Sequence, residues 1–172
     1  DRDWKPYTHG RWIYNRDVGW YFESDEPWAE VTYHYGRWFE DPEQGWVWVA
    51  DTKWAPAWVE WRRSKKHIGW RPLPPENIRV SVRRERARPV TVEEEWVFVP
   101  AREITAERIS TVVVSRTEVT EVYRETRPAG RVETRGAYAV NLALRPDVIE
   151  RESNVRIETR NIPRAEAVPV PA

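Results

Sequence analysis

Residues 34–54 of this 172-residue chain read HYGRWFEDPEQGWVWVADTKW, and residues 8–28 read THGRWIYNRDVGWYFESDEPW. At an offset of 26 residues, the two stretches agree in their glycine, arginine, tryptophan and aspartate positions. The matching pairs are Gly10/Gly36, Arg11/Arg37, Trp12/Trp38, Gly19/Gly45, Trp20/Trp46, Asp25/Asp51 and Trp28/Trp54. An internal repeat governs the whole architecture, so we expect the two stretches to fold alike.

The spacing of the tryptophans within the repeats favours strands. They recur every eight residues, at Trp12, Trp20 and Trp28 and again at Trp38, Trp46 and Trp54. On a helix, eight steps turn a residue by about 80° from its starting face, so the rings would spread around the surface. Flanking segments such as RWIY and WVWV are rich in β-branched and aromatic residues, which suit strands. We therefore expect short strands, with these six rings in a structural core.

Two loops within the repeats predict β-hairpins. In DPEQG, residues 41–45, Pro42 suits the second position of a type I turn and Gly45 can adopt a positive φ. NRDVG, residues 15–19, matches this loop without the proline and ends at Gly19. A third pair of strands is expected from residues 57–61 and 67–73. The sequence thus predicts an all-β fold that begins with an antiparallel meander or small roll of three hairpins.

The composition changes near RPLPPEN, residues 71–77. Eleven of the twelve tryptophans precede this proline-rich segment, and Trp96 alone follows it. We therefore predict a Trp-rich hairpin domain over residues 1–75, a second β-rich domain over residues 76–163 and an extended Pro-rich tail over residues 164–172.

Alternation of polar and β-branched residues predicts further strands in the second part of the chain. The segments with this pattern are residues 77–100 and 109–126, followed by strand-like segments at 131–144 and 155–162. Residues 146–153, PDVIERES, predict one short helix, because proline is favoured at the first helical position and Asn154 can end the helix.

Composition and charge exclude several classes of function. Lys and Arg number 28, as do Asp and Glu, so no net charge attracts nucleic acid or an anionic membrane. Cysteine is absent, which excludes disulfides and cysteine-bound metals. No apolar run is long enough for a transmembrane helix. Methionine is also absent, so Asp1 is expected to be a processed or trimmed end, with removal of a secretory leader as the simplest cause.

The tryptophans have two interpretations, as core residues or as stacking platforms for sugars or bases. Burying one indole removes roughly 200 Å² from water, worth about 5 kcal/mol. Residues 1–75 contain few Leu and Ile, so exposing several rings would remove much of the apolar area available for folding. We expect most rings to be structural, which leaves room for one or two exposed rings.

The arginines of the repeated Gly-Arg-Trp block also have two interpretations. Arg11 and Arg37 could contact phosphate or nucleic acid, or each guanidinium could stack on a neighbouring aromatic ring. The many interleaved carboxylates and the zero net charge argue against nucleic acid. We therefore expect stacking.

Neither the histidines nor the repeated aspartates predict a reactive site. His9 and His34 occupy different repeat positions, and no metal-binding spacing is present, so no metal or other cofactor is expected. Asp25 and Asp51 could form a glycosidase-like carboxylate pair. An equivalent aspartate in each repeat is explained more simply as a turn or capping residue, so we predict no catalytic residues.

Several spaced motifs resemble a known family. WKPYTHGRW, GWYFESDEPW, YHYGRWFEDPEQGWVWVADTKWAPAWVEWR, GWRPLPP and EWVFVP are similar to motifs in a family of uncharacterised secreted bacterial proteins. The Trp-rich domain of that family has no assigned function and sometimes accompanies FecR-like or lipoprotein segments. The resemblance covers residues 3–75 and continues more loosely to RPDVIERESNVRI, but residues 101–135 depart from it. It implies an all-β core and export to the periplasm or cell surface, and it supplies no catalytic residues.

These features lead to two functional hypotheses. The first is a non-enzymatic, extracytoplasmic structural protein that self-associates into an oligomer or filament. Its contacts would come from strand edges or from Val168, Pro169, Val170 and Pro171 in the tail. The alternative is a cell-envelope carbohydrate-binding module for glycan or peptidoglycan, which requires exposed Trp or Tyr rings with carboxylates beside them.

Overall fold

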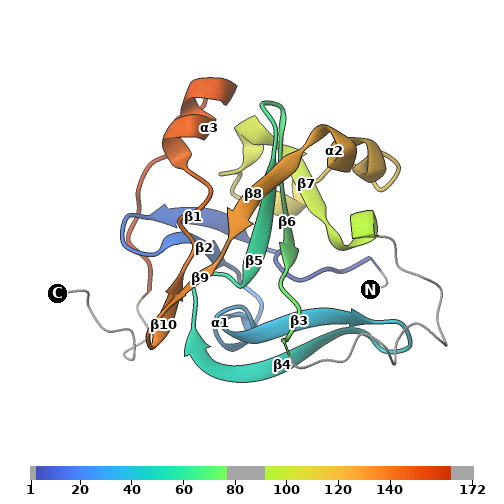
Figure 1. Cartoon of the computed structure of the whole chain (residues 1–172), viewed down its shortest axis with the longest axis vertical. Helices are drawn as coiled ribbons and strands as arrows, with labels where there is room; N and C mark the ends of the chain where they lie inside the picture. Colours follow the sequence, from blue (N-terminus) through green and yellow to red (C-terminus); the bar gives the residue numbers. More distant parts are fainter. Residues whose placement is uncertain (1–2, 77–91, 164–172) are drawn as a thin grey trace.

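The computed structural model describes residues 3–76 and 92–163 of the chain (Figure 1). Within these residues, ten strands form three sheets, accompanied by short helices. This arrangement confirms the predicted all-β fold class.

Three hairpins follow one another in the first 72 residues. They are β1 (Arg11–Asn15) with β2 (Gly19–Glu23), β3 (Tyr35–Asp41) with β4 (Gly45–Trp54), and β5 (Val59–Arg63) with β6 (His67–Pro72). All three pair antiparallel, as the loop sequences predict. They do not join into one continuous meander, because each hairpin belongs to a different sheet.

Strands from the second part of the chain extend two of these sheets. They are β7 (Val97–Pro100), β8 (Arg127–Arg131), β9 (Glu133–Arg135) and β10 (Tyr138–Val140). One sheet has the order β3-β4-β10-β9 and another the order β7-β6-β5-β8. In Figure 1, the β5–β6 hairpin stands between β8 and β7 and above the β3–β4 hairpin. The boundary predicted at residue 75 therefore marks a change in amino-acid composition. The parts of the chain before and after it both contribute strands to the same two sheets.

The loops of the first two hairpins are built alike. The Asn15 Oδ1 atom accepts hydrogen bonds from the backbone N–H groups of Asp17 and Val18, and the Asp41 Oδ1 atom accepts from those of Glu43 and Gln44. Gly19 and Gly45 end the loops with φ angles of +85° and +79°. Pro42 lies in the second loop, directly after Asp41. A side chain that accepts two backbone hydrogen bonds thus opens each turn.

The two repeats also share a close approach between two backbone segments, at Gly10 and at Gly36. A Cβ atom on Gly10 would lie 2.0 Å from the carbonyl oxygen of Glu23, and one on Gly36 would lie 2.2 Å from that of Val49. Glu23 and Val49 are themselves 26 residues apart. The glycine that precedes each Arg-Trp pair is therefore explained by lack of space for a side chain.

The strand predicted over residues 109–126 is wrong. This segment contains a 3₁₀ turn, η4 (Ile109–Thr111), and a helix, α2 (Val119–Glu125). Ser115 donates a hydrogen bond from its hydroxyl to Glu118 at 2.8 Å, which closes a turn directly before the helix. Val119 and Val122 then pack against Trp96 and Phe98. The three-residue spacing of these valines places both on one face of the helix. Their packing there prevails over the preference of β-branched residues for strands.

The other predictions for the second part have mixed outcomes. The described part of the segment 77–100 holds a 3₁₀ helix, η2 (Val92–Glu95), before β7, so only its last four residues are confirmed as a strand. Residues 131–144 contain the β9–β10 hairpin. In the segment 155–162, the described structure has a single bridge between Thr159 and Tyr14. The short helices α1 (Ala29–Thr32) and η3 (Ala101–Glu103) were not predicted.

The predicted helix at residues 146–153 is confirmed as α3 (Pro146–Ser153). Proline occupies its first turn, and Asn154 follows the helix in the left-handed conformation with a φ angle of +51°. Both features are the ones that the sequence indicated.

Tryptophan rings form the centre of the core. The largest fully buried side chains include Trp12, Trp20, Trp61 and Trp70. The Trp12 ring centroid lies 4.8 Å from that of Trp61 and 5.4 Å from that of Trp70. The fully buried Asn141 accepts a hydrogen bond from Trp61 Nε1 at 2.6 Å and donates one to the Ala57 carbonyl at 3.2 Å. A residue of the second part of the chain thus satisfies a buried polar atom in the Trp-rich part.

Candidate functional site

A cavity of about 670 Å³ lies between the N-terminal segment, the β3–β4 hairpin and residues 94–120. Its lining includes three tryptophans, Trp4, Trp46 and Trp96, together with Lys5 and Glu40. We call it the Trp groove. Its volume is in the range of small-molecule sites, and its mixture of aromatic and polar side chains is typical of such sites.

The three rings contribute to the groove in different ways. Trp4 and Trp46 are partly buried and pack against the main core. Trp4 makes an edge contact with Trp38, with the ring centroids 5.3 Å apart. Trp96 is 4% exposed and stacks on Phe98 at 6.0 Å, so it forms part of the rigid base of the groove. Trp4 and Trp46 are therefore the rings that retain exposed surface for a ligand.

Lys5 fixes the N-terminal segment against the other side of the groove. Its Nζ atom donates a hydrogen bond to the backbone carbonyl of Glu94 at 2.6 Å. Burial lowers the pKa of the Lys5 amine below its ordinary value, and the negative charge of Glu40 acts in the opposite direction. A desolvated amine held in this way is a directed hydrogen-bond donor.

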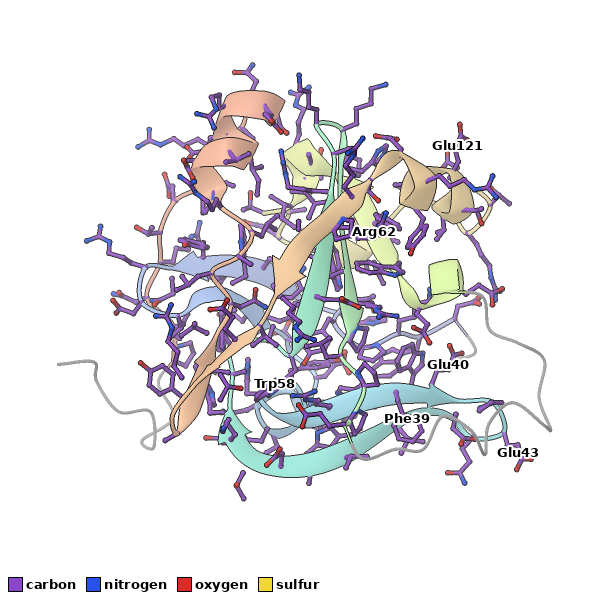
Figure 2. All side chains as sticks on the ribbon, in the orientation of Figure 1. Phe39, Glu40, Glu43, Trp58, Arg62 and Glu121 are labelled. Atoms are coloured by element: carbon purple, nitrogen blue, oxygen red, sulfur yellow. The ribbon has the colours of Figure 1, made fainter. Side chains whose placement is uncertain are left out.

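Glu40 supplies a carboxylate to the same groove. Figure 2 shows Glu40 on the side of the β3–β4 hairpin that faces the rest of the molecule, while Glu43 lies at the outer tip. Burial raises the pKa of the Glu40 carboxyl above its ordinary value, and the charge of Lys5 lowers it. The two opposite shifts have one cause, because partial exclusion of water disfavours both charges.

Other lining residues supply hydroxyls and an apolar wall. The Thr8 hydroxyl donates to the Lys5 carbonyl at 2.6 Å and lies 3.1 Å from His9 Nδ1. Val113 and Val114 line the groove and are partly buried. The groove can thus contact a ligand through ring faces, methyl groups and hydrogen-bonding groups at once.

The six tryptophans predicted as repeat core have different environments. Trp12, Trp20, Trp38 and Trp54 are each at most 9% exposed. Trp46 lines the Trp groove, and Trp28 is 49% exposed directly before α1. Two repeat-equivalent pairs, Trp20/Trp46 and Trp28/Trp54, therefore have one buried and one more exposed member. The tail residues Val168, Pro169, Val170 and Pro171 lie outside the described residues.

The repeated arginines make different contacts. The Arg37 guanidinium lies 4.9 Å from the centre of the Trp58 ring, as stacking requires. Arg11 instead pairs with Glu23 across the first hairpin, at 2.8 Å.

The structure brings neither the histidines nor the aspartates into the Trp groove as a catalytic or metal-binding set. His34 is 2% exposed and donates from Nδ1 to the Ala55 carbonyl, while His9 alone of the two lines the groove. Asp51 accepts a hydrogen bond from the Thr52 backbone N–H, and Asp25 is exposed. Across residues 3–76 and 92–163, no cluster of three or more His, Asp or Glu side chains could hold a metal ion.

The sequence did not predict Lys5, Glu40 or Val113 as groove residues. They come from three distant segments. Lys5 and Glu40 lie within the motifs that resemble a known family but were not singled out in them, and Val113 lies outside those motifs. One signal in the sequence could have indicated the N-terminal segment: Trp4 precedes the Gly10-Arg11-Trp12 block much as Trp28 precedes the Gly36-Arg37-Trp38 block.

In the part of the chain that the structure describes, no helix combines the length and apolar character needed to cross a membrane.

Comparison with known proteins finds a similarity for the Trp-rich part of the chain. No curated protein and no solved structure matches the chain. The model of the family DUF6600, described as a family of unknown function, matches residues 1–77. The match includes all three hairpins together with Trp4, Lys5, Glu40 and Trp46, and it ends before Trp96 and Val113. Over residues 1–77 the chain is therefore similar to a family of unknown function.

Proposed function

We propose that the protein is a non-enzymatic carbohydrate-binding module whose ligand site is the Trp groove. The observation that supports this proposal is the presence of two partly exposed indoles, Trp4 and Trp46, in one cavity with Glu40 and Lys5. This combination is the one that the carbohydrate hypothesis required, although only two rings provide it.

The chemistry of sugars explains why this groove suits them. A pyranose has an apolar face of C–H groups, which packs on an indole, and a rim of hydroxyls, which need donors and acceptors. A carboxylate such as Glu40 accepts from hydroxyls, and an amine such as Lys5 donates to them. Because burial weakens competition from water at both groups, each hydrogen bond contributes more than it would on an open surface.

The proposal is tested by calorimetric titration of the full chain with soluble oligosaccharides, for the unchanged protein, Trp46→Ala and Trp28→Ala. We expect Trp46→Ala to weaken binding at least tenfold, or about 1.4 kcal/mol. Trp28 is also exposed but lies outside the groove lining, so Trp28→Ala should leave the affinity unchanged. Thermal denaturation of both variants checks that they are folded. Absence of binding to any oligosaccharide, or equal loss in both variants, would contradict the proposal.

Self-association is a second candidate function, supported by an exposed apolar pair at α1. Trp28 and Val31 are 49% and 52% exposed. Light scattering of the intact chain, of Trp28→Asp and of a chain lacking residues 164–172 tests this candidate. We expect a concentration-dependent increase in mass for the intact chain and a decrease in one or both variants. A monomer in all three samples would exclude it.

We also propose an extracytoplasmic location. Its support is the resemblance of residues 3–75 to a family of secreted bacterial proteins. Fractionation of bacteria that express the natural full-length protein tests this proposal, and recovery from the cytoplasm alone would contradict it.

A further inference from the structure

Val113 and Val114 form an apolar part of the Trp groove lining, which we call the valine wall. The rings and polar groups of the groove account for binding of a plain sugar ring, so this wall needs another explanation. We propose that the groove selects neutral glycans that carry N-acetyl groups, a selectivity that rests on the proposed carbohydrate-binding function. The structural basis is the combination of Val113 and Val114 with a charge balance that disfavours acidic sugars.

The valine wall distinguishes an acetamido group from a hydroxyl. Val113 and Val114 are partly buried, and Val97 and Val119 line the groove beside them. An acetamido methyl that packs on these side chains gains hydrophobic burial. A hydroxyl in the same place would lose its water and find no hydrogen-bond partner on a valine, which is a net cost.

Polar groups of the groove can satisfy the amide of an acetamido group. The exposed Ser110 lines the groove, and its hydroxyl can both donate and accept. The Lys5 amine adds a donor for the amide oxygen. A ligand with an amide and a methyl group thus matches both kinds of surface in this groove.

The charges argue against acidic glycans. Three carboxylates, Asp3, Glu40 and Glu94, line the groove with two basic side chains, Lys5 and Arg116. Both cations lie near carboxylates: the charge of Glu40 acts on Lys5, and Arg116 lies 3.7 Å from Asp3. A uronic acid would add a carboxylate to a site whose carboxylates already outnumber its cations, so its charge is disfavoured relative to a neutral sugar of the same shape.

The test is calorimetric titration of the full chain with three β-1,4-linked trisaccharides of equal length. The first consists of N-acetylglucosamine alone, the second of glucose alone and the third of glucuronic acid alone. We expect the acetylated trimer to bind at least tenfold more tightly than the glucose trimer and the acidic trimer to bind most weakly.

Valine-to-threonine substitutions identify the surface that causes the preference. Val113→Thr and Val114→Thr keep the shape of the side chain but place a hydroxyl in the wall. Either change should reduce the ratio of the affinity for the acetylated trimer to that for the glucose trimer at least threefold. Val31→Thr is the matched control, because Val31 is exposed on α1 and does not line the groove. Using two wall variants keeps the test informative if one of them fails to fold.

The outcomes separate this inference from the proposed function. Equal affinity for the two neutral trimers, or tighter binding of the acidic one, overturns the selectivity while carbohydrate binding stands. A preference that is insensitive to both wall variants also overturns the assignment to the valines. If none of the trimers and no other oligosaccharide binds, the proposed function fails and the selectivity fails with it.

Discussion

Gly19 and Gly45 occupy equivalent turn positions but have different surroundings. Both have positive φ angles, of +85° and +79°, so alanine at either site is strained by about 1–2 kcal/mol. A Cβ atom on Gly19 would also lie 1.8 Å from the Asn141 carbonyl oxygen, whereas no described atom lies within 4 Å of one on Gly45. We expect Gly19→Ala to cost at least about 2 kcal/mol more than Gly45→Ala. Urea denaturation measures the difference, and equal costs would contradict the close approach at Gly19.

His34 makes the stability of the protein sensitive to acid. It is buried between Tyr21 and Trp54, and burial lowers the pKa of its imidazole to about 4 from an ordinary value of 6.5. Between these two pH values the unfolded chain binds a proton that the folded chain does not, so stability rises with pH over this window. We expect this histidine to account for a loss of about 3 kcal/mol in the free energy of unfolding from pH 6.5 to pH 4.

The measurement compares denaturation curves at several pH values for the unchanged protein, His34→Gln and His9→Gln. The glutamine at position 34 can still donate to the Ala55 carbonyl but does not titrate. We expect His34→Gln to flatten the pH dependence and His9→Gln to preserve it, because His9 is half exposed. An unchanged slope in His34→Gln would show that another group causes the acid sensitivity.

Among the secondary-structure elements, α2 depends on a short polar turn. Ser115 donates to the Glu118 carboxylate, and the same carboxylate accepts from the Ser115 backbone N–H at 3.3 Å. We expect Ser115→Ala to destabilise the protein by about 1 kcal/mol. Figure 2 shows Glu121 on the outer face of α2, so Glu121→Gln serves as a control and should change stability by less than about 0.5 kcal/mol. Thermal denaturation tests both variants, and equal shifts would contradict a specific role for the turn.

The sequence predicted the elements whose determinants are local. The hairpin loops follow from Asn15, Asp41 and the glycines that end them, and α3 follows from Pro146 and Asn154. The strand predicted at 109–126 failed because β-branched residues alternate there, while Ser115 and Glu118 form a helix-start pattern within the same segment. Where two local patterns compete, packing of Val119 and Val122 against Trp96 and Phe98 decides.

The candidate site was much less predictable than the hairpins. The repeat implies the same environment for Trp20 and Trp46, but Trp20 is covered by the segment that follows β10 and donates from Nε1 to the Leu144 carbonyl. Trp46 is not covered in this way and lines the Trp groove. Backbone equivalence is encoded locally, whereas exposure depends on which distant segment packs on each copy.

At the scale of the whole molecule, the Trp-rich part depends on the residues that follow it. Trp61 and Trp20 donate to Asn141 and Leu144, and β5 and β6 pair with β8 and β7. We expect a chain that ends at residue 76 to lack a cooperative unfolding transition, because these partners are absent and the apolar surfaces of β5 and β6 are exposed. Near-ultraviolet circular dichroism and thermal denaturation of this fragment make the test. A cooperative transition with the tryptophan signature of the intact chain would show that residues 1–76 fold alone.

The unequal exposure of Trp20 and Trp46 has a consequence for which substitutions this protein can accept. A duplicated unit normally leaves equivalent residues under the same constraints, but here Trp20 is enclosed by the segment that follows β10, while its equivalent Trp46 borders the Trp groove. A substitution at Trp20 is expected to destabilise the fold, whereas a substitution at Trp46 is expected to change the proposed ligand site more than the stability. Efforts to change the proposed ligand preference should therefore begin at Trp46 and its neighbours in the Trp groove, with Trp20 left unchanged.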